Sequence, residues 1–227
     1  MKQIVILSLS LLAFSFFIGC EKSNRPSLDE ALTQDFFSAI SDNNLSEIKT
    51  LLKKEPNLVF ARDNLGFTPL IVASRYGETK IVEYLLRNKS EVNAKGNMGE
   101  TALFRTIDVN NFENAKILIK FGADPNIKES SQDWAPLPCA SYYGNLEIVK
   151  LLIKNGADVN VTGKYDQTPL HWSMRAITWN NQKEIVKYLI QKGVDLNHED
   201  SNGETALQMA EKRSSDGVVE ILRKNTR

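Results

Sequence analysis

Apolar residues in this chain recur at helical spacing, in short stretches that come in pairs. The apolar positions of residues 81–86 and 148–152 each fit one face of a helix. Thr68 and Pro69 place a capping hydroxyl before a proline at the first helical position, where the missing N–H is not needed. Gly156 stands where a helix commonly ends in a left-handed residue. The pattern predicts pairs of short helices.

The pairs repeat with a nearly constant period. Five turn segments share one pattern, and their Thr or Ala positions lie 33, 34, 33 and 37 residues apart. These segments are residues 66–70, 99–103, 133–137, 166–170 and 203–207. A second landmark keeps the same period at residues 91–93, 122–126, 156–160 and 193–197. Two short helices cannot bury both of their faces alone, so the units are expected to stack on one another.

The repeat resembles the ankyrin repeat, whose unit of about 33 residues is a turn followed by two helices. Residues 168–171 reproduce the Thr-Pro-Leu-His signature of that family in full, and residues 122–126 and 156–160 match the exit from its second helix. The resemblance covers residues 28–227. It implies an all-α ankyrin-repeat solenoid of about six helix-turn-helix units, counting both caps.

The first unit and three internal positions depart from the repeat. Residues 27–30 have the spacing of a capping box, and the first unit lacks the turn signature. Asn110 replaces the glycine that closes the first helix in other units, so we expect an irregular turn there. Pro138 is expected in the first turn of a helix, which needs no amide donor. Four extra residues around 178–181 predict a loop between the two helices of the fifth unit.

The first twenty residues differ from the rest of the chain. Lys2 is followed by an almost unbroken apolar run over residues 4–18, the order of a secretory signal, and the run is short for a bilayer span of about 20 residues. The segment 17–20 resembles the lipobox of bacterial lipoproteins, in which a small residue precedes a cysteine that is diacylated. Phe17 stands where that motif usually has Leu, which leaves a signal cut elsewhere, or retained as an anchor, as alternatives.

This interpretation divides the chain into three parts. Residues 1–19 are predicted to be a lipoprotein signal peptide, residues 20–27 the lipidated Cys20 with a short tether, and residues 28–227 the repeat domain. The tether reaches at most about 20 Å when fully extended. We therefore expect an exported protein, held close to a bacterial membrane by the lipid on Cys20, on the periplasmic or outer surface.

Composition and charge exclude several functions. Apolar residues at 42% and charged residues at 25% are ordinary for a globular chain, and 28 basic residues balance 28 acidic ones. No basic excess is present for binding nucleic acid.

If Cys20 carries lipid, Cys139 has no partner for a disulfide, and its apolar neighbours predict a small buried side chain.

Catalytic chemistry is poorly supplied. The chain has two histidines; His171 fills the family signature, where the resemblance implies a hydrogen bond to Thr168, and His198 lies in the following turn. Neither a phosphate-binding glycine loop nor a nucleophile elbow is present. We expect no enzyme activity, no metal site, no cofactor and no small-molecule substrate.

The resemblance places a protein partner on the turn tips and on the exposed face of each first helix. Many of these positions are aromatic, as is common in interfaces. Leu65 is one of these turn-tip positions. The predicted partner-binding residues are Phe67, Arg75, Tyr76, Met98, Glu100, Asp108, Trp134, Tyr142, Tyr143, Tyr165 and Arg175. The alternative is that several of these rings cover neighbouring turns and stabilise the stack. Other aromatic residues, among them Phe104 and Trp172, are predicted to belong to the core.

The leading hypothesis is a membrane-tethered protein–protein interaction module of the bacterial cell envelope, which binds an unknown partner protein through its concave face. The alternative is a structural or client-shielding component of the envelope. A secreted effector or hydrolase has the least support, because only the export signal favours it.

Overall fold

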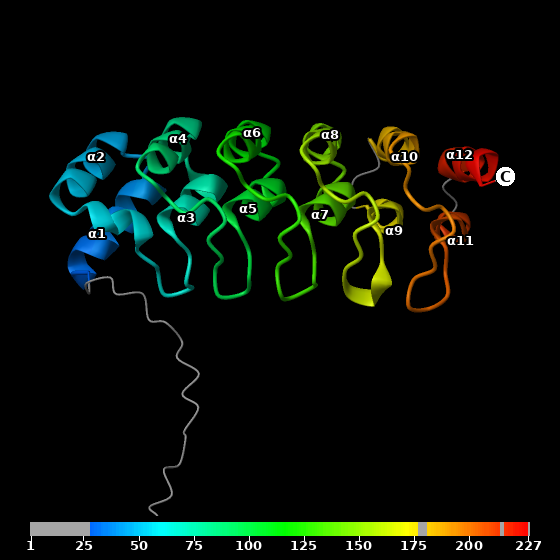
Figure 1. Cartoon of the computed structure of the whole chain (residues 1–227), viewed down its shortest axis with the longest axis horizontal. Helices are drawn as coiled ribbons and strands as arrows, with labels where there is room; N and C mark the ends of the chain where they lie inside the picture. Colours follow the sequence, from blue (N-terminus) through cyan, green and yellow to red (C-terminus); the bar gives the residue numbers. More distant parts are fainter. Residues whose placement is uncertain (1–27, 177–180, 214–215, 227) are drawn as a thin grey trace, which may run out of the picture.

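The computed structural model describes residues 28–176, 181–213 and 216–226. Its helices come in consecutive pairs and form one elongated array (Figure 1). The first helices of the units are α1 (Glu30–Ser41), α3 (Pro69–Tyr76), α5 (Ala102–Asp108), α7 (Pro136–Tyr143), α9 (Pro169–Met174) and α11 (Ala206–Lys212). The second helices are α2 (Leu45–Lys54), α4 (Thr79–Arg87), α6 (Phe112–Lys120), α8 (Leu146–Lys154), α10 (Gln182–Gln191) and α12 (Asp216–Asn225). Two short 3-10 helices are η1 (Pro56–Phe60) and η2 (Lys164–Asp166).

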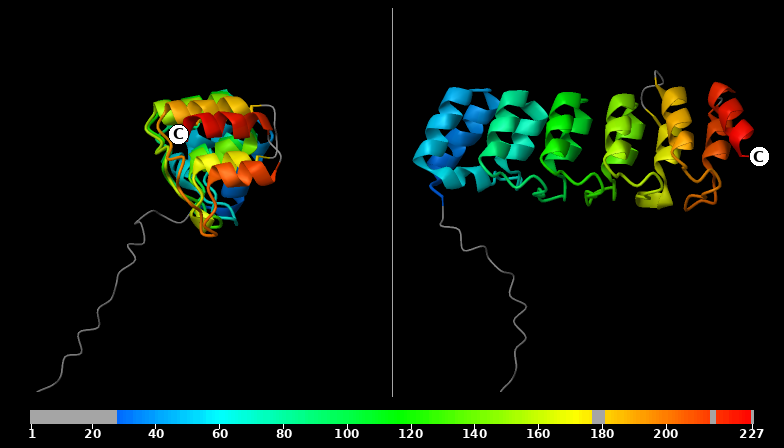
Figure 2. Two further views of the ribbon diagram at one scale, coloured as in Figure 1. Left: turned by 90° about the vertical axis from the view of Figure 1, so that its right-hand side faces the viewer. Right: turned by 45° about the horizontal axis from the view of Figure 1, so that its top comes forward.

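The array confirms the predicted all-α solenoid of six helix pairs. The second helices form one row and the first helices another, and the turns hang along the opposite edge (Figures 1 and 2). Throughout the described residues the only strand-type pairing is an isolated bridge between Glu199 and Thr205. We call the row of turns at residues 61–67, 94–100, 127–134, 161–167 and 198–204 the turn edge.

From the second unit on, each first helix begins at a threonine cap, as the sequence predicts, or in α7 at an alanine. The Thr68 hydroxyl accepts the Ile71 amide at 3.3 Å, and Pro69 occupies the first helical position. In α7 the cap is Ala135, and both Pro136 and Pro138 lie in the first turn. The position of Pro138 is therefore confirmed. The first helices then pack on their neighbours, α3 on α5 and α7 on α9.

The core runs continuously through the units. The predicted inward residues Ile81, Leu85 and Ile148 are at most 1% exposed. Cys139 is a free cysteine with no exposed surface, and burial raises the pKa of its thiol well above the ordinary value. The prediction of a small buried side chain is confirmed.

The turn between the helices of the third unit corrects our expectation at Asn110. Asn110 has a φ of 52° and Gly144 a φ of 73°, so both are left-handed. The following amides, of Asn111 and Asn145, bond back to the first helix in the same way. The prediction of an irregular turn at Asn110 is wrong, because asparagine tolerates this conformation. The second unit does differ, because its Gly77 has a φ of −86°.

The structure describes the start of α1 but not every segment that the sequence predicts around the array. The cap of α1 is Asp29, whose carboxylate accepts the Leu32 amide at 2.9 Å, so the expected capping box starting at Ser27 is wrong. The predicted signal peptide and tether lie outside the described residues, as does most of the predicted loop at 178–181. Among the described helices, none is long and apolar enough to cross a membrane.

Candidate protein-interaction surface

Backbone hydrogen bonds between neighbouring turns hold the turn edge in register. The Ser130 amide donates to the Met98 carbonyl oxygen at 2.7 Å, and the Ser201 amide donates to the Tyr165 carbonyl oxygen at 2.9 Å. In both cases the acceptor lies near the tip of the preceding turn. The tips therefore form a row whose spacing is fixed by main-chain contacts.

A buried carboxylate supports the turn of the fourth unit, at residues 127–134, from inside. Glu129 is 5% exposed and accepts the amides of Ser131 at 2.8 Å and Gln132 at 2.7 Å. Burial alone would raise the pKa of Glu129, but the hydrogen bonds from Ser131, Gln132 and Trp134 outweigh it and leave the pKa below its ordinary value. The charged carboxylate thus fixes the loop that carries Trp134.

A charged network crosses the third unit. The guanidinium of Arg105 donates to Glu100 at 2.9 Å and to Asp108 at 3.0 Å, and it lies over the ring of Phe67, 5.0 Å from the ring centre. The side chains of Arg105 and Asp108 keep 18% and 19% of their surface exposed. Arg105 is not among the predicted residues. The signal that marks it is an arginine at the position where the other units have Val72, Cys139, Trp172 and Met209.

An aromatic cluster covers the first helices of the fourth and fifth units. The ring centres of Trp134 and Trp172 are 4.6 Å apart, those of Trp134 and Tyr142 are 5.5 Å apart, and Tyr143 packs on Tyr142 at 5.4 Å. Trp172 is 6% exposed, which confirms that it is buried, yet its ring belongs to this cluster. The guanidinium of Arg175 lies 5.7 Å from the centre of the Trp172 ring.

The predicted partner-binding residues differ in the fraction of their surface that is exposed to solvent. The exposed members are Tyr76, Met98 and Tyr165, at 59%, 55% and 50%. The half-buried members are Phe67, Arg75, Asp108, Trp134, Tyr142, Tyr143 and Arg175. Glu100 is 4% exposed, and its carboxylate holds Arg105 and the Met98 amide. It serves the surface by positioning Arg105 rather than by direct exposure.

We define the inner strip as the surface that these side chains form along the first helices. Its members are Phe67, Arg75, Tyr76, Arg105, Asp108, Trp134, Tyr142, Tyr143 and Arg175. Within it the guanidinium of Arg75 lies 5.0 Å from the ring centre of Tyr76. The inner strip combines aromatic rings with arginine side chains held in place by neighbours, the composition of residues that contribute most to protein–protein binding.

A pocket of about 230 Å³ lies where the turn edge meets the inner strip. It is lined by the predicted residues Met98, Glu100, Asp108 and Trp134, together with Arg105 and others. Residues that the sequence analysis predicted from two neighbouring units therefore meet in this pocket. A pocket of this size fits one side chain of a partner.

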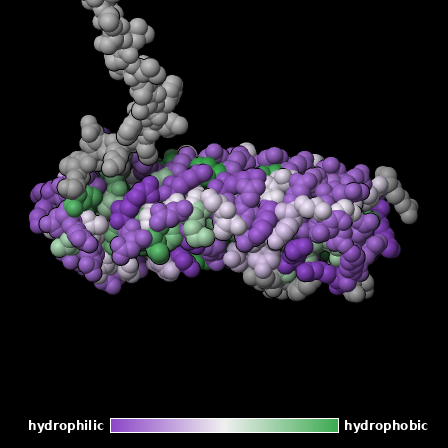
Figure 3. Space-filling model, turned by 90° about the horizontal axis from the view of Figure 1, so that it is seen from below, coloured by the Kyte–Doolittle hydropathy of each residue, from purple (hydrophilic) through white to green (hydrophobic). Residues whose placement is uncertain are grey.

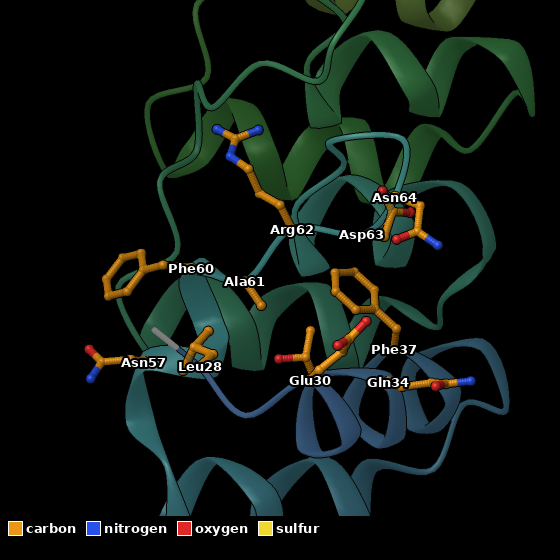
Figure 4. Close-up of a pocket in the computed structure, with 11 residues that line it drawn as sticks. Leu28, Glu30, Gln34, Phe37, Asn57, Phe60, Ala61, Arg62, Asp63 and Asn64 are labelled. Carbon is orange, nitrogen blue, oxygen red and sulfur yellow. The ribbon is translucent and has the colours of Figure 1, made fainter. Parts of the chain in front are cut away.

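A second hollow, of about 640 Å³, lies at the first unit (Figure 4). Leu28, Phe37 and Phe60 supply its apolar wall, and Glu30 and Asn64 are among its polar residues. It lies between the first part of α1 and residues 57–64 of the segment that leads into the second unit. None of the predicted partner-binding residues lines it.

The histidines have structural contacts. The Nδ1 atom of His171 lies 2.8 Å from the Thr168 hydroxyl, which confirms the hydrogen bond implied by the signature, and its Nε2 atom lies 3.1 Å from the Glu204 carbonyl oxygen. Burial lowers the pKa of His171 to about 4. The Nε2 atom of His198 lies 2.9 Å from the Asp166 carbonyl oxygen. Within the described part of the chain, no group of His, Cys, Asp and Glu side chains is placed to hold a metal ion.

The stacked helix pairs and their turns define the class of protein. The family model described as ankyrin repeats (3 copies) matches residues 16–96, 36–129, 90–163 and 137–227. The chain therefore belongs to the ankyrin-repeat family. Members of this family generally act as protein–protein interaction modules and not as enzymes.

Individual relatives match parts of the array. A putative ankyrin repeat protein of Rickettsia bellii is 38% identical over 85 residues, which cover 35% of this chain and 50% of that protein. The neurogenic locus notch homolog protein 1 of Cricetulus griseus is 30% identical over 96 residues, 42% of this chain and 4% of the relative. The palmitoyltransferase AKR1 of Lachancea kluyveri is 29% identical over 134 residues, 58% of this chain and 18% of the relative. The chain thus spans half or less of the length of these relatives.

Proposed function

We propose that this protein is a membrane-tethered interaction module of a bacterial cell envelope, which binds one partner protein through the inner strip and catalyses no reaction. The observation that carries the proposal is the aromatic cluster of Trp134, Tyr142, Tyr143 and Trp172. The partly exposed rings of Trp134, Tyr142 and Tyr143, with arginines beside them, supply apolar contact area with little side-chain entropy to lose on binding.

The electrostatic arrangement favours recognition of a specific partner. Arg105 is held by two carboxylates and by the Phe67 ring, so its position is set before a partner arrives. A preorganised side chain loses less entropy on binding than a free one. The pocket beside it gives a partner side chain one defined place to enter.

The lipid half of the proposal rests on the sequence around Cys20. A cysteine that carries two or more acyl chains anchors a protein stably, whereas one chain binds only reversibly. Metabolic labelling with a clickable fatty acid tests this half. We expect label on the wild-type protein and none on the Cys20→Ser variant. An unlabelled wild-type protein with normal export would contradict the anchor and leave the binding half standing.

The binding half is tested by capture from a detergent extract of the envelope. The wild-type protein is expected to retain one stoichiometric partner, which the Trp134→Ala/Tyr143→Ala double variant loses. Lys187→Ala, on the exposed side of α10, is the matched control and should retain it. A partner retained equally by all three proteins would contradict binding through the inner strip.

A further inference from the structure

Large apolar side chains project from the turn edge at equivalent places. Leu65 is 63% exposed, Met98 55% and Tyr165 50%. Each lies at the third position of a tight turn, because the amides of Gly66, Gly99 and Asp166 bond back across three residues. Core packing does not require apolar residues at these tips, since the sixth unit has Asn202 there.

The same edge has a polarity gradient along the array. Seen from the turn edge, hydrophobic residues gather toward the N-terminal half, and the C-terminal half is mostly hydrophilic (Figure 3). The turns of the second and third units carry Leu65 and Met98, whereas the turn of the sixth unit carries Glu199 and Asn202. The apolar part of the edge thus lies nearest the first unit.

Charges at these tips suit a lipid–water interface. Lys95 lies three residues before Met98, and Lys164 directly precedes Tyr165. Long basic side chains can keep their charge in water while their stems lie against apolar surface. Two acidic side chains of this edge have partners, since Asp63 accepts the Leu65 amide at 2.9 Å and Asp133 pairs with Lys128 at 2.9 Å.

The chain enters the array at this same edge. Leu28 lines the hollow near Phe60, and Asn64, which directly precedes the tip residue Leu65, lines the same hollow (Figure 4). The six residues between Cys20 and Ser27 span at most about 20 Å when fully extended. An anchor at Cys20 therefore keeps the turns of the second and third units within reach of the membrane surface.

We propose that the turn tips of the second, third and fifth units rest in the lipid–water interface of the membrane that holds the acyl chains of Cys20. This inference relies on the lipid anchor of the proposed function. A short tether makes the second contact intramolecular, so a few partly inserted side chains suffice to orient the array. The inner strip then faces sideways along the membrane, where a membrane-bound or peripheral partner reaches it.

The test uses the acylated protein reconstituted into vesicles of phosphatidylethanolamine and phosphatidylglycerol. The fluorophore NBD is attached to Leu65→Cys, Met98→Cys or Tyr165→Cys, with Lys187→Cys on α10 as the matched control. Cys139 is fully buried and is not expected to react, and Cys139→Ala variants check this. Brominated lipids then quench any fluorophore that contacts the acyl region.

We expect blue-shifted emission and at least twofold stronger quenching at positions 65, 98 and 165 than at position 187. Equal quenching at all four positions, or quenching at 187 alone, would overturn the inference. A shift at the tips that appears only after envelope proteins are added would also overturn it and would assign the tips to a protein. Failure of the protein to float with the vesicles would instead refute the anchor, which the fatty-acid label reports independently.

Discussion

The third and fifth units place different side chains at the same positions of their first helices. Gln167 of the fifth unit is fully buried and donates to Asp200 of the next turn at 2.7 Å, and His171 joins Thr168 to Glu204. At the positions of Gln167, Trp172 and Arg175 the third unit has Glu100, Arg105 and Asp108.

The ion pairs of the third unit stay within that unit and reach its surface. Arg105 pairs with Glu100 and Asp108 and remains partly exposed. The position of Gln167 and Glu100 thus serves two purposes. In the fifth unit it joins neighbouring units, and in the third it holds Arg105 at the surface. The comparison predicts that changes in the fifth unit reduce stability and that changes in the third unit reduce binding.

The largest effect is expected for His171→Ala. This substitution removes contacts to Thr168 and Glu204 and leaves a cavity at a residue that is 1% exposed. We expect a loss of about 3 kcal/mol in the free energy of unfolding, from unpaired groups and lost packing together. Urea denaturation followed by circular dichroism measures it. A loss below about 1 kcal/mol would contradict a linking role for His171.

Acid should weaken the fifth unit through the same residue. The pKa of His171 is about 4 in the folded protein, because burial opposes the charge, whereas a solvated histidine has an ordinary pKa of 6.5. The unfolded chain therefore binds the proton more readily, so stability is complete above pH 6.5 and falls as the pH drops toward 4.

The expected loss across this window is about 2 to 3 kcal/mol, from 1.36 kcal/mol per pKa unit with an allowance for partial solvation. Urea denaturation at several pH values measures it. His171→Gln is the control, and its unfolding free energy should change little between pH 6.5 and 5. An equal slope in both proteins would assign the acid sensitivity to the carboxylates instead.

The fourth unit, between the two compared, should show an intermediate effect. Replacing the buried Cys139 with Ala removes one sulfur atom from the core, and we expect a loss of about 1 to 2 kcal/mol. Cys139→Val, whose side chain is larger than that of cysteine, is expected to cost a similar amount. A disulfide between Cys139 and Cys20, detected by mass spectrometry, would contradict both the buried thiol and the lipid anchor.

The smallest change in stability is expected for Asp108→Asn in the third unit. The amide keeps the shape of the carboxylate, and a partly exposed ion pair contributes little, so we expect a change below about 1 kcal/mol. Binding of the partner identified by envelope capture should nevertheless weaken at least tenfold. Isothermal titration calorimetry measures this affinity, and unchanged binding would place recognition outside the third unit.

Much of the fold followed from the sequence because each unit repeats the same local signals. The Thr-Pro starts, the apolar spacing of the second helices and the period of 33 to 37 residues fix the helix pairs. The two errors, at Asn110 and at the cap of α1, arose where one residue replaces another with the same function. Asn110 adopts the conformation of a glycine, and Asp29 supplies the cap expected from Ser27.

The candidate site was only partly predictable. Family positions selected Trp134 and Tyr142, which the structure places in one cluster, but not their contact with Trp172. Arg105 was missed because the carried-over positions follow the average repeat, whereas this arginine replaces an apolar residue. Contacts that cross between units depend on stacking geometry, which the pattern within one unit does not contain.

Site-specific photo-crosslinking in living cells tests the central claim most directly. A benzophenone amino acid replaces Tyr142 or Tyr143 on the inner strip, or Lys187 on α10, in the acylated protein. The account predicts one prominent crosslinked protein from positions 142 and 143, present in the membrane fraction, and none from position 187. Crosslinks that form equally from all three positions, or from 187 alone, would contradict binding through the inner strip.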